Sequence, residues 1–567
     1  MILHSKALIK CGRSMRDVLK LAALSSALVL AACGGGGSDG AGVSFPVAWQ
    51  MPSATPALVA NVATDTRQTR EVVPGITLYN LTVGSVSADD GFEVTVGFVR
   101  NQADAVPLTD ALKSAGYSTK FVGTVDNAAT GYAVRLDKRY ATMADADAVV
   151  TAIKALTTLP AASEKLAVGA GRVFTAEDGG ATKGPYRLSL LAVRPSFKGT
   201  LKSALGTDIV PGRETTTSLA NRTGALAAIN GGFFQLDFAT GTAGGLAGLS
   251  VIDGRLVSEG VEGRPALFIE KSADGTNTAR VERKISTVIS VSVNAGVAKR
   301  IDGTNRRPQV AANCGRPFDK ETSIAMHDAI CTNDNAIIVY TPDFGSTVST
   351  GSNVTVPVVE VVLDASGAVT AVNTQSGSNI PARGQVLQGI GSGAQWLASN
   401  ISVGSKVNVT RKLINGSGKE IALNPGVYAI NGGPTLLVDG GTVESDAAME
   451  GWGNANVAGY PWFATNGNRA NFYNGWYLRR NPRTAVGVAA DGTILMLVSD
   501  GRAPMYSAGL SISETSLVLK HFGAVSAINL DGGGSSMMVV GGVQQTRPSD
   551  AGNIERADGD ALLIFSK

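Results

Sequence analysis

The sequence predicts an α+β protein, with a large domain of mixed, twisted sheets and few helices that follows a smaller domain. Glycine is the first indication: 69 of the 567 residues are glycine, about 12% against a usual ~7%, which favours turns over long helices. The chain from Phe174 onward also consists of short apolar segments separated by Gly, Asn and Asp, a pattern typical of strands and turns. The hydrophobic fraction of 44% supports sizeable cores, and the length exceeds that of one usual domain.

The N-terminus is typical of an export signal. Basic residues up to Lys20 precede the apolar run Leu21–Ala32, which is shorter than the ~20 residues that span a bilayer. The tetrad Leu30-Ala31-Ala32-Cys33 resembles the bacterial lipobox, in which the cysteine is acylated and becomes the mature N-terminus. We expect a signal peptide at 1–32 and a flexible tether at 33–70, with Cys33 anchored to an envelope membrane on its periplasmic or surface-exposed face. An ordinary cleaved signal with a chance cysteine is the alternative.

Residues 71–160 are predicted to form a small α+β domain with a leading strand. Alternating apolar residues in Phe92–Phe98 and Tyr132–Leu136 each predict a strand, and a helix follows each one, at Val106–Ala115 and Ala144–Leu156. Two such units of ~30 residues favour a ferredoxin-like sheet with helices on one face.

This small domain resembles the SPOR domain, a family that binds peptidoglycan glycan strands. The resemblance implies peptidoglycan as a partner, whereas a plain α+β spacer is the alternative. The residues that carry it are Val94, Gly97, Phe98 and Val99, then Leu112-Lys113-Ser114-Ala115-Gly116-Tyr117, and Tyr132-Ala133-Val134-Arg135-Leu136.

The large domain is predicted to span residues 165–567. Its best helix is Ser513–Phe522, with Ser511 or Ser513 as the N-cap and Gly523 ending it. The segment Val72–Tyr79 alternates like a strand, and it would join the main sheet if the small domain is inserted after it. The clear strands are Tyr186–Val193, Ala225–Ile229, Ala336–Tyr340, Val358–Leu363, Thr484–Val488, Ile494–Val498 and Ala524–Leu530.

Three of the predicted strands end in the same kind of turn, an Asn followed by glycines. Successive glycine N–H groups can bind an anion, and neighbouring hydroxyls can add donors to phosphate oxygens. One such turn is usually only structural, but three with the same order indicate a binding site. The turns are Asn230-Gly231-Gly232-Phe233-Phe234, Asn431-Gly432-Gly433-Pro434 and Asn529-Leu530-Asp531-Gly532-Gly533-Gly534-Ser535-Ser536.

Charged residues border two adjacent predicted strands. Arg483 and Thr484 begin one strand, and Asp500 and Arg502 follow the next. A hairpin that turns at Asp491-Gly492 would bring these ends together. The planar guanidinium of arginine suits bidentate contact with a phosphodiester, while a surface salt bridge across the hairpin is the alternative.

These motifs occur in the order seen in the phosphodiester glycosidase family, which includes N-acetylglucosamine-1-phosphodiester α-N-acetylglucosaminidase. The resemblance covers residues 165–567, with weaker matches at Asp302-Gly303-Thr304-Asn305-Arg306, Tyr340-Thr341-Pro342 and Arg556. It implies hydrolysis of a sugar-1-phosphodiester on the glycosidic side, which gives a free sugar and a phosphomonoester. That reaction needs a held phosphate, an acid or base, and stabilisation of oxocarbenium-like charge.

The resemblance and the turn chemistry together suggest a role for each candidate residue. Asp531, Asp500 and Glu514 are the candidate catalytic carboxylates. Asn230 and Asn431 would hydrogen-bond sugar hydroxyls. The residues expected to bind phosphate or substrate are Gly231, Gly232, Gly432, Arg483, Thr484, Arg502, Gly532, Gly533, Ser535 and Ser536.

Two other functions stay open at this stage. A divalent cation, Ca²⁺ or Mg²⁺, held by Asp500, Asp531 and Asp558 would make a phosphodiesterase that cleaves the P–O bond. A non-catalytic lipoprotein that binds cell-wall glycan is the second. The net charge of +3 gives no case for nucleic-acid binding, and three scattered histidines argue against a zinc site.

Cysteines and aromatic residues complete the sequence features. Cys314 and Cys331 are the only cysteines after Cys33, and in an oxidising compartment their disulfide would stabilise the fold by ~3 kcal/mol; two buried free thiols are the alternative. Trp452, Trp462 and Trp476 belong to an aromatic cluster before Arg483, which would either stack on sugar rings or pack on the core. The sequence does not identify the sugar or the phosphate aglycone.

Overall fold

The computed structural model describes twelve stretches of the chain beyond the export signal. The expected signal peptide, Cys33 and Cys314 all lie outside them, as does Trp462. Within the described stretches, no helix has the length and apolar character needed to cross a membrane. The stretches are residues 47–58, 65–99, 101–126, 129–163, 165–178, 182–236, 241–312, 330–349, 356–443, 450–452, 473–503 and 505–566.

The small domain forms an antiparallel sheet with the strand order β4-β5-β3-β6. Its β-α-β-β-α-β chain order is the ferredoxin-like topology that the sequence predicts. The strand β4 was not foreseen, and β6 carries this sheet to Phe174, past the expected boundary at 160. The elements are β3 (Phe92–Val99), α1 (Val106–Ser114), β4 (Thr119–Asp126), β5 (Ala129–Leu136), α2 (Met143–Lys154) and β6 (Leu166–Phe174).

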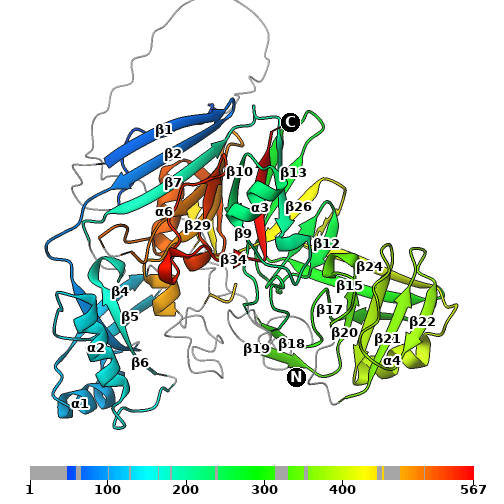
Figure 1. The fold of residues 1–567 in the computed structure, drawn as a ribbon, viewed down its shortest axis with the longest axis horizontal. Coiled ribbons are helices and arrows are strands. Elements are labelled where there is room, and N and C mark those ends of the chain that lie inside the picture. The colour runs from blue at the N-terminus through cyan, green and yellow to red at the C-terminus, as the bar shows by residue number, and fades with distance from the viewer. Residues whose placement is uncertain are drawn as a thin grey trace, which may run out of the picture. The chain divides into compact units, whose positions relative to one another are not determined.

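The main sheet has eight strands in the order β1-β2-β7-β30-β29-β31-β27-β28. The leading strands β1 and β2 belong to it, because β2 pairs antiparallel with β7 from Ile76↔Val193 to Val83↔Tyr186 (Figure 1). The small domain is therefore inserted between β2 and β7. The strands are β1 (Asp65–Val73), β2 (Ile76–Val83), β7 (Tyr186–Val193), β27 (Thr435–Val438), β28 (Gly441–Thr442), β29 (Arg483–Ala489), β30 (Ile494–Ser499) and β31 (Ala524–Asn529).

Two five-stranded sheets contribute the other turns of interest. The first has the order β33-β32-β10-β35-β8 and the second β12-β11-β26-β13-β14. Their strands are β8 (Thr200–Leu205), β10 (Ala227–Asn230), β11 (Ser250–Ile252), β12 (Arg255–Ser258), β13 (Ala266–Lys271), β14 (Asn277–Glu282), β26 (Val427–Asn431), β32 (Met538–Val540), β33 (Val543–Gln544) and β35 (Asp560–Phe565).

The remaining sheets occupy the middle of the sequence. One has the order β16-β15-β24-β25, and another β17-β20-β23-β21-β22, against which α4 (Ser392–Asn400) packs. The pairs β18-β19 and β34-β9 are separate. The strands are β9 (Glu214–Thr215), β15 (Ser286–Val293), β16 (Ala298–Ile301), β17 (Gly303–Thr304), β18 (Gln309–Ala312), β19 (Ile330–Asn333), β20 (Ile337–Tyr340), β21 (Val358–Leu363), β22 (Val369–Asn373), β23 (Gln385–Ile390), β24 (Val407–Ile414), β25 (Glu420–Ile421) and β34 (Ala557–Asp558); α3 (Thr216–Thr223) precedes β10.

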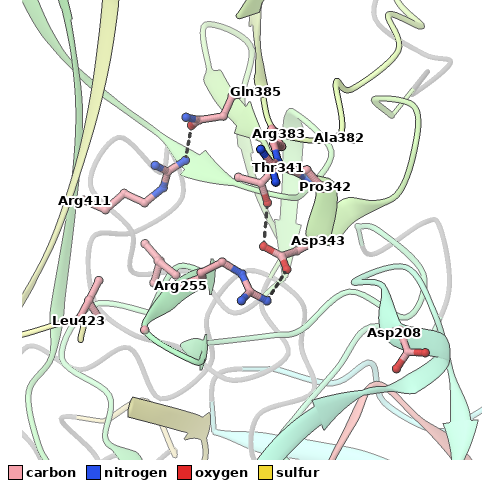
Figure 2. A pocket seen from close by; sticks show the side chains of 13 residues that line it. Asp208, Arg255, Thr341, Pro342, Asp343, Ala382, Arg383, Gln385, Arg411 and Leu423 are labelled. Atoms are coloured by element: carbon pink, nitrogen blue, oxygen red, sulfur yellow. Dashed lines mark hydrogen bonds and ion pairs between the residues drawn. The ribbon is translucent and has the colours of Figure 1, made fainter. Parts of the chain in front are cut away.

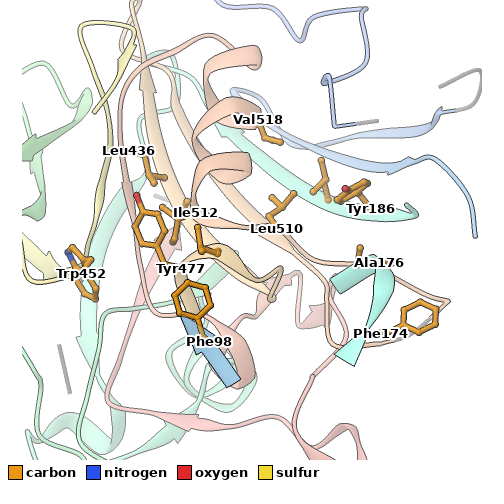
Figure 3. Packing of buried hydrophobic residues seen from close by; sticks show 14 of the residues in the cluster. Phe98, Phe174, Ala176, Tyr186, Leu436, Trp452, Tyr477, Leu510, Ile512 and Val518 are labelled. Atoms are coloured by element: carbon orange, nitrogen blue, oxygen red, sulfur yellow. The ribbon is translucent and has the colours of Figure 1, made fainter. Parts of the chain in front are cut away.

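One hydrophobic core connects the small domain to the main sheet. Figure 3 shows Phe98 and Phe174 of the small domain in the same cluster as Tyr186 of β7 and Ile512 of α6. The helix α6 (Ile512–His521) begins at the N-cap Ser511, whose side chain accepts a hydrogen bond from the Glu514 N–H. These elements confirm the predicted class of several sheets with few helices. Cys331, one of the two cysteines of the expected disulfide, is disulfide-bonded.

Candidate active site

The three Asn-Gly turns meet in space. The Asn230 amide donates to the Asp531 carbonyl (2.8 Å), and the Gly433 N–H donates to the Asn529 carbonyl (2.7 Å). The Asn431 side chain accepts from the Phe233 N–H (2.8 Å). Three sheets therefore end at one place, which is the candidate site.

The asparagine side chains hold these turns together rather than facing a ligand. Asn230 is fully buried, and its carbonyl oxygen accepts from the Thr484 hydroxyl (2.6 Å) and the Met537 N–H (3.1 Å). Asn431 is also buried, and it bonds both the N–H and the carbonyl of Phe233. The sugar contacts expected of Asn230 and Asn431, and the substrate contact expected of Thr484, would need accessible side chains, which the structure does not give them.

The glycines of the first two turns permit close packing. A Cβ at Gly231 would lie 2.1 Å from the Asp560 carboxylate, and one at Gly232 would lie 2.4 Å from the Asn431 carbonyl oxygen. At Gly432, the Asn529 carbonyl oxygen would be 2.5 Å away. The Gly232 N–H already donates to Asp560 (2.8 Å), so this N–H is not available to a phosphate.

Asp531 lies at the start of the third turn and is partly accessible, although protein surrounds it on most sides. Its carboxylate accepts hydrogen bonds from the Gly532 N–H (2.8 Å) and the Ser535 hydroxyl (2.8 Å). Burial raises the pKa of Asp531 to about 6, despite these two donors and the charges of Arg556 and Arg502. This carboxyl can therefore exchange a proton near neutral pH.

Two further carboxyls lie beside Asp531. Asp558 and Asp560 are both buried, and burial together with the charge of Asp531 raises the pKa of each, to about 7 for Asp560. Ser535, which donates its hydroxyl to Asp531, also lowers the pKa of Asp558, so it lies close to both carboxyls. From the sequence, Asp558 was expected only as a metal ligand, and Asp560 was given no role. The signal for both is the polar Asp558-Gly559-Asp560 at the start of the apolar strand β35.

Asp500, Asp531 and Asp558, the carboxylates of the metal hypothesis, do not lie together at one point. Within the described ranges, no group of three or more His, Cys, Asp or Glu side chains has the arrangement to hold one. Asp500, which the metal hypothesis requires, interacts with Arg187, Arg547 and Tyr506 rather than with Asp531.

Two arginines border the Asp531 turn. Arg556 makes a bidentate pair with Asp550 (2.9 Å for both contacts), and it also lies 3.5 Å from the Ser535 hydroxyl. Arg502 is exposed, its Nε donates to Asn481 (3.0 Å), and it forms no ion pair with a carboxylate of the described residues. A Cβ at Gly533 would lie 2.8 Å from the Arg502 Nη2, so this glycine admits the guanidinium. Arg502 is free to bind an anion.

Arg483 lies deeper than expected. The predicted hairpin exists, with Arg483 opposite Ser499 across β29 and β30. However, Arg483 is buried, its Nε donates to the Leu510 carbonyl (2.9 Å), and its guanidinium lies 4.9 Å from the Trp476 ring. Burial and the charge of Arg502 lower its pKa to about 9. Arg483 therefore holds neighbouring backbone in place through its hydrogen bonds and adds a buried positive charge. It does not lie at the surface, where it could contact a phosphate directly.

Glu514 has a structural role. Its carboxylate accepts from the Ser511 N–H (2.9 Å) to complete the capping box of α6, and it pairs with Arg480 (2.7 Å). Asp500 accepts from the Arg547 N–H (2.8 Å), and burial raises its pKa to about 6. Of the three expected catalytic carboxylates, Asp531 is the one that lies in the glycine-rich turn, together with Gly532, Gly533 and Ser535. Ser536 follows it, buried, and its hydroxyl has no hydrogen-bond partner among the residues described.

Two neighbours of the site extend it toward other parts of the chain. Glu177, at the exit of the small domain, pairs with Arg479 (3.3 Å) and accepts from the Arg480 N–H through its carbonyl. Trp452 is fully buried and stacks on Trp476 with ring centroids 5.1 Å apart. These two tryptophans therefore pack together, as the core alternative for the aromatic cluster predicts.

A comparison with protein families matches the part of the chain that contains the Asp531 turn. Residues 357–565 match the family model for phosphodiester glycosidase. This range contains Arg483, Arg502, Asp531 and the carboxyls Asp558 and Asp560.

Three relatives illustrate the similarity. A crystal structure of a Burkholderia pseudomallei protein that is described as exported is 36% identical with a TM-score of 0.81, and the match covers 91% of this chain and 99% of that one. The prophage-derived protein YomE of Bacillus subtilis is 38% identical over 85 residues, which is 15% of this chain and 13% of YomE. Mouse N-acetylglucosamine-1-phosphodiester α-N-acetylglucosaminidase is 40% identical over 68 residues, which is 12% of this chain and 13% of the mouse protein.

The two curated relatives are thus matched over 13% of their own length, whereas the B. pseudomallei protein is matched over nearly all of it. The chain therefore belongs to the same family as this B. pseudomallei protein, and its residues 357–565 match a phosphodiester glycosidase domain.

Proposed function

We propose that the protein hydrolyses a sugar-1-phosphodiester on the glycosidic side and releases a free sugar and a phosphomonoester. The observation that carries this proposal is the Asp531 turn, where a partly accessible carboxyl with a raised pKa lies beside Arg502 and Arg556. The turn lies inside the segment that matches phosphodiester glycosidases.

Phosphate binding falls to the two arginines at this turn. Arg502 has no carboxylate partner in the described structure, so its guanidinium can pair with a phosphodiester oxygen. Arg556 shares its charge with Asp550 but also reaches toward Ser535. Arg483 contributes a buried positive charge, which stabilises an anion nearby without touching it.

Asp531 is the carboxyl that we assign to the chemistry. With a pKa of about 6 it is mostly ionised at neutral pH, so it can oppose the positive charge that develops at the anomeric carbon or accept a proton from water. Burial and the charge of Asp531 raise the pKa of Asp558, and Ser535 lies close to both carboxyls. Phosphate is a good leaving group, so little acid assistance is required.

The position of bond cleavage is tested by hydrolysis in ¹⁸O-water. A soluble form of the chain is incubated with an α-sugar-1-phosphodiester that carries a small alkyl aglycone, and both products are analysed by mass spectrometry. We expect ¹⁸O in the sugar, because water attacks the anomeric carbon. Label in the phosphate would instead mean P–O cleavage, and the proposal would be wrong.

The role of Asp531 is tested in the same assay. Asp531→Asn removes the titratable group at the same size, and we expect turnover to fall ~10²–10⁴-fold, the usual contribution of a general acid or base. The matched control is Glu420→Gln, an exposed carboxyl of β25, which should leave turnover unchanged. Near-wild-type turnover of Asp531→Asn would exclude Asp531 as the catalytic carboxyl.

We also propose that the protein acts at the cell envelope as a lipoprotein, a proposal supported by the apolar run and lipobox-like tetrad before Cys33. Expression of wild-type protein and Cys33→Ala, followed by separation of membrane and soluble fractions, tests this. The wild type should be in the membrane fraction and the variant in the soluble one. Equal distribution of both would refute the anchor.

The small domain is proposed to hold peptidoglycan glycan, with support from its ferredoxin-like topology and its SPOR-like sequence pattern. The soluble chain should be retained by purified sacculi and released by soluble glycan strands. Absence of retention would leave this domain as a spacer.

A further inference from the structure

A cavity in the large domain is lined by none of the residues of the candidate active site (Figure 2). Its volume is ≈ 610 Å³, within the ~300–1,000 Å³ usual for small-molecule sites. Its walls come from the β11–β12 turn around Arg255, the segment Thr341–Asp343, the loop before β23, and Arg411 of β24.

The charges around this cavity do not balance. Figure 2 shows Arg255 reaching Asp343, and the pair is 3.1 Å apart. The other acidic lining residue, Asp208, is paired with Arg222 (2.7 Å). Arg383 and Arg411 form no ion pair with any carboxylate of the described stretches. The three arginines of the lining therefore face two carboxylates, and Asp208 is paired with an arginine outside the lining.

Arg411 is the more telling of the two arginines. Its Nη2 donates to the Gln385 amide oxygen (2.7 Å), which is a neutral partner. Its Nε is buried and has no hydrogen-bond partner in the described structure. Burial lowers the pKa of Arg411 to about 10, although the charge of Asp343 opposes the shift. A guanidinium withdrawn from water without an anion is costly, and an anion in the cavity would remove that cost.

The rest of the lining suits a ligand with an organic part. Leu256, Pro342 and Leu423 supply apolar surface. The Thr341 hydroxyl is already hydrogen-bonded to Asp343 (3.1 Å) and Asn305 (2.9 Å). Two guanidinium groups match the charge of a phosphate monoester, which is close to −2 at pH 7, better than that of a single carboxylate.

We propose that this cavity binds a small phosphate-bearing molecule, held by Arg383 and Arg411 and oriented by Gln385. The site uses no residue of the Asp531 turn. It therefore stands whether or not the proposed hydrolysis is correct.

Isothermal titration of the soluble chain tests the site, with inorganic phosphate, glucose 6-phosphate and acetate as probes. Arg502→Gln weakens any phosphate binding at the candidate active site, so binding that survives in this variant reports the cavity. We expect Arg383→Gln/Arg411→Gln to reduce that remaining affinity at least ~10-fold, the loss typical of a charge-assisted hydrogen bond or two. Arg70→Gln, an exposed arginine of β1, is the control and should bind as the wild type.

The single variant Arg383→Gln is included because Arg383 is exposed, so its replacement should not disturb folding. This variant should weaken phosphate binding by itself. Tighter binding of glucose 6-phosphate than of inorganic phosphate indicates a sugar phosphate; equal binding indicates free phosphate. Three results would overturn the proposal: no phosphate binding in Arg502→Gln, unchanged binding in the double variant, or acetate binding as tightly as phosphate.

Discussion

The Asp531 turn and the arginine-lined cavity both withdraw charged side chains from water, but they satisfy them in different ways. At the turn, acidic groups lie close together, and each oxygen of Asp531 accepts a hydrogen bond from within its own loop. In the cavity, Arg411 has one neutral partner on another strand. The first region therefore raises the pKa values of its carboxyls, and the second keeps positive charge without an anion.

This difference also concerns how each region is built. The Asp531 turn depends on glycines that let backbone and side chains come close, so a single added methyl group would disturb it. The cavity is lined by longer side chains from segments that are far apart in the sequence, so its properties depend on individual charges. Replacing a glycine with a larger residue should therefore affect the Asp531 turn most. Removing a charge should affect the cavity most.

Gly534→Ala is expected to have the largest effect at the turn. A Cβ at this position would lie 2.2 Å from the Asp550 carboxylate and 2.3 Å from the Arg556 Nη2, so the Asp550–Arg556 pair must move away from Ser535. We expect kcat/KM for a sugar-1-phosphodiester to fall ~10²-fold or more, as misplacement by about 1 Å does.

The control for this variant is Gly171→Ala, where the space around the added Cβ is open. It should keep wild-type kcat/KM. If Gly534→Ala also kept it, close packing would not be what sets the geometry of the turn.

Local sequence patterns reveal strand ends but not the contacts that the whole fold creates. This is why the sequence predicted the turn but not the cavity. The convergence of Asn230, Asn431 and Asn529 depends on residues at strand ends, and a local pattern of Asn and glycine marks such ends. This local pattern could not reveal that the Asn230 side chain would hydrogen-bond Thr484 and Met537 inside the protein, because burial depends on the whole fold. The position of Arg411 opposite Gln385 depends on how two sheets meet, which no local pattern encodes.

The small domain shows the same division. Its helices and two of its strands follow from the apolar periodicity, as β3 and α2 illustrate. The strand β6 pairs with β3 across more than sixty intervening positions, and the pairing moves the domain boundary past 160. Strand pairing over such a distance is decided by tertiary contacts.

Asp560→Asn tests whether burial, together with the charge of Asp531, raises the pKa of Asp560 in the folded state. The pKa of Asp560 is raised to about 7 from an ordinary value of 3.8, so the folded state holds a proton that the unfolded state loses between these two pH values. The free energy of unfolding must then fall as the pH rises through this window. Between pH 4 and pH 8, we expect the wild type to lose about 2–4 kcal/mol more than Asp560→Asn.

Urea unfolding at several pH values measures this difference. Comparing the change with pH, rather than stability at one pH, cancels the cost of placing an amide in the buried site. Parallel pH profiles for the two proteins would mean that Asp560 is ionised without penalty in the folded state.

Glu514→Gln is expected to have the smallest effect, and it separates a structural carboxyl from Asp531, the carboxyl that we propose for the chemistry. Glutamine can still accept from the Ser511 N–H, so the capping box is kept. The charge on the partner of Arg480 is lost, and because Arg480 is buried, we expect a destabilisation of about 1–2 kcal/mol. Turnover should stay within about twofold of the wild type, since the contacts of Glu514, to the N-terminus of α6 and to Arg480, are structural. A loss of turnover comparable to that of Asp531→Asn would place Glu514 in the reaction and move the chemistry from the Asp531 turn toward α6.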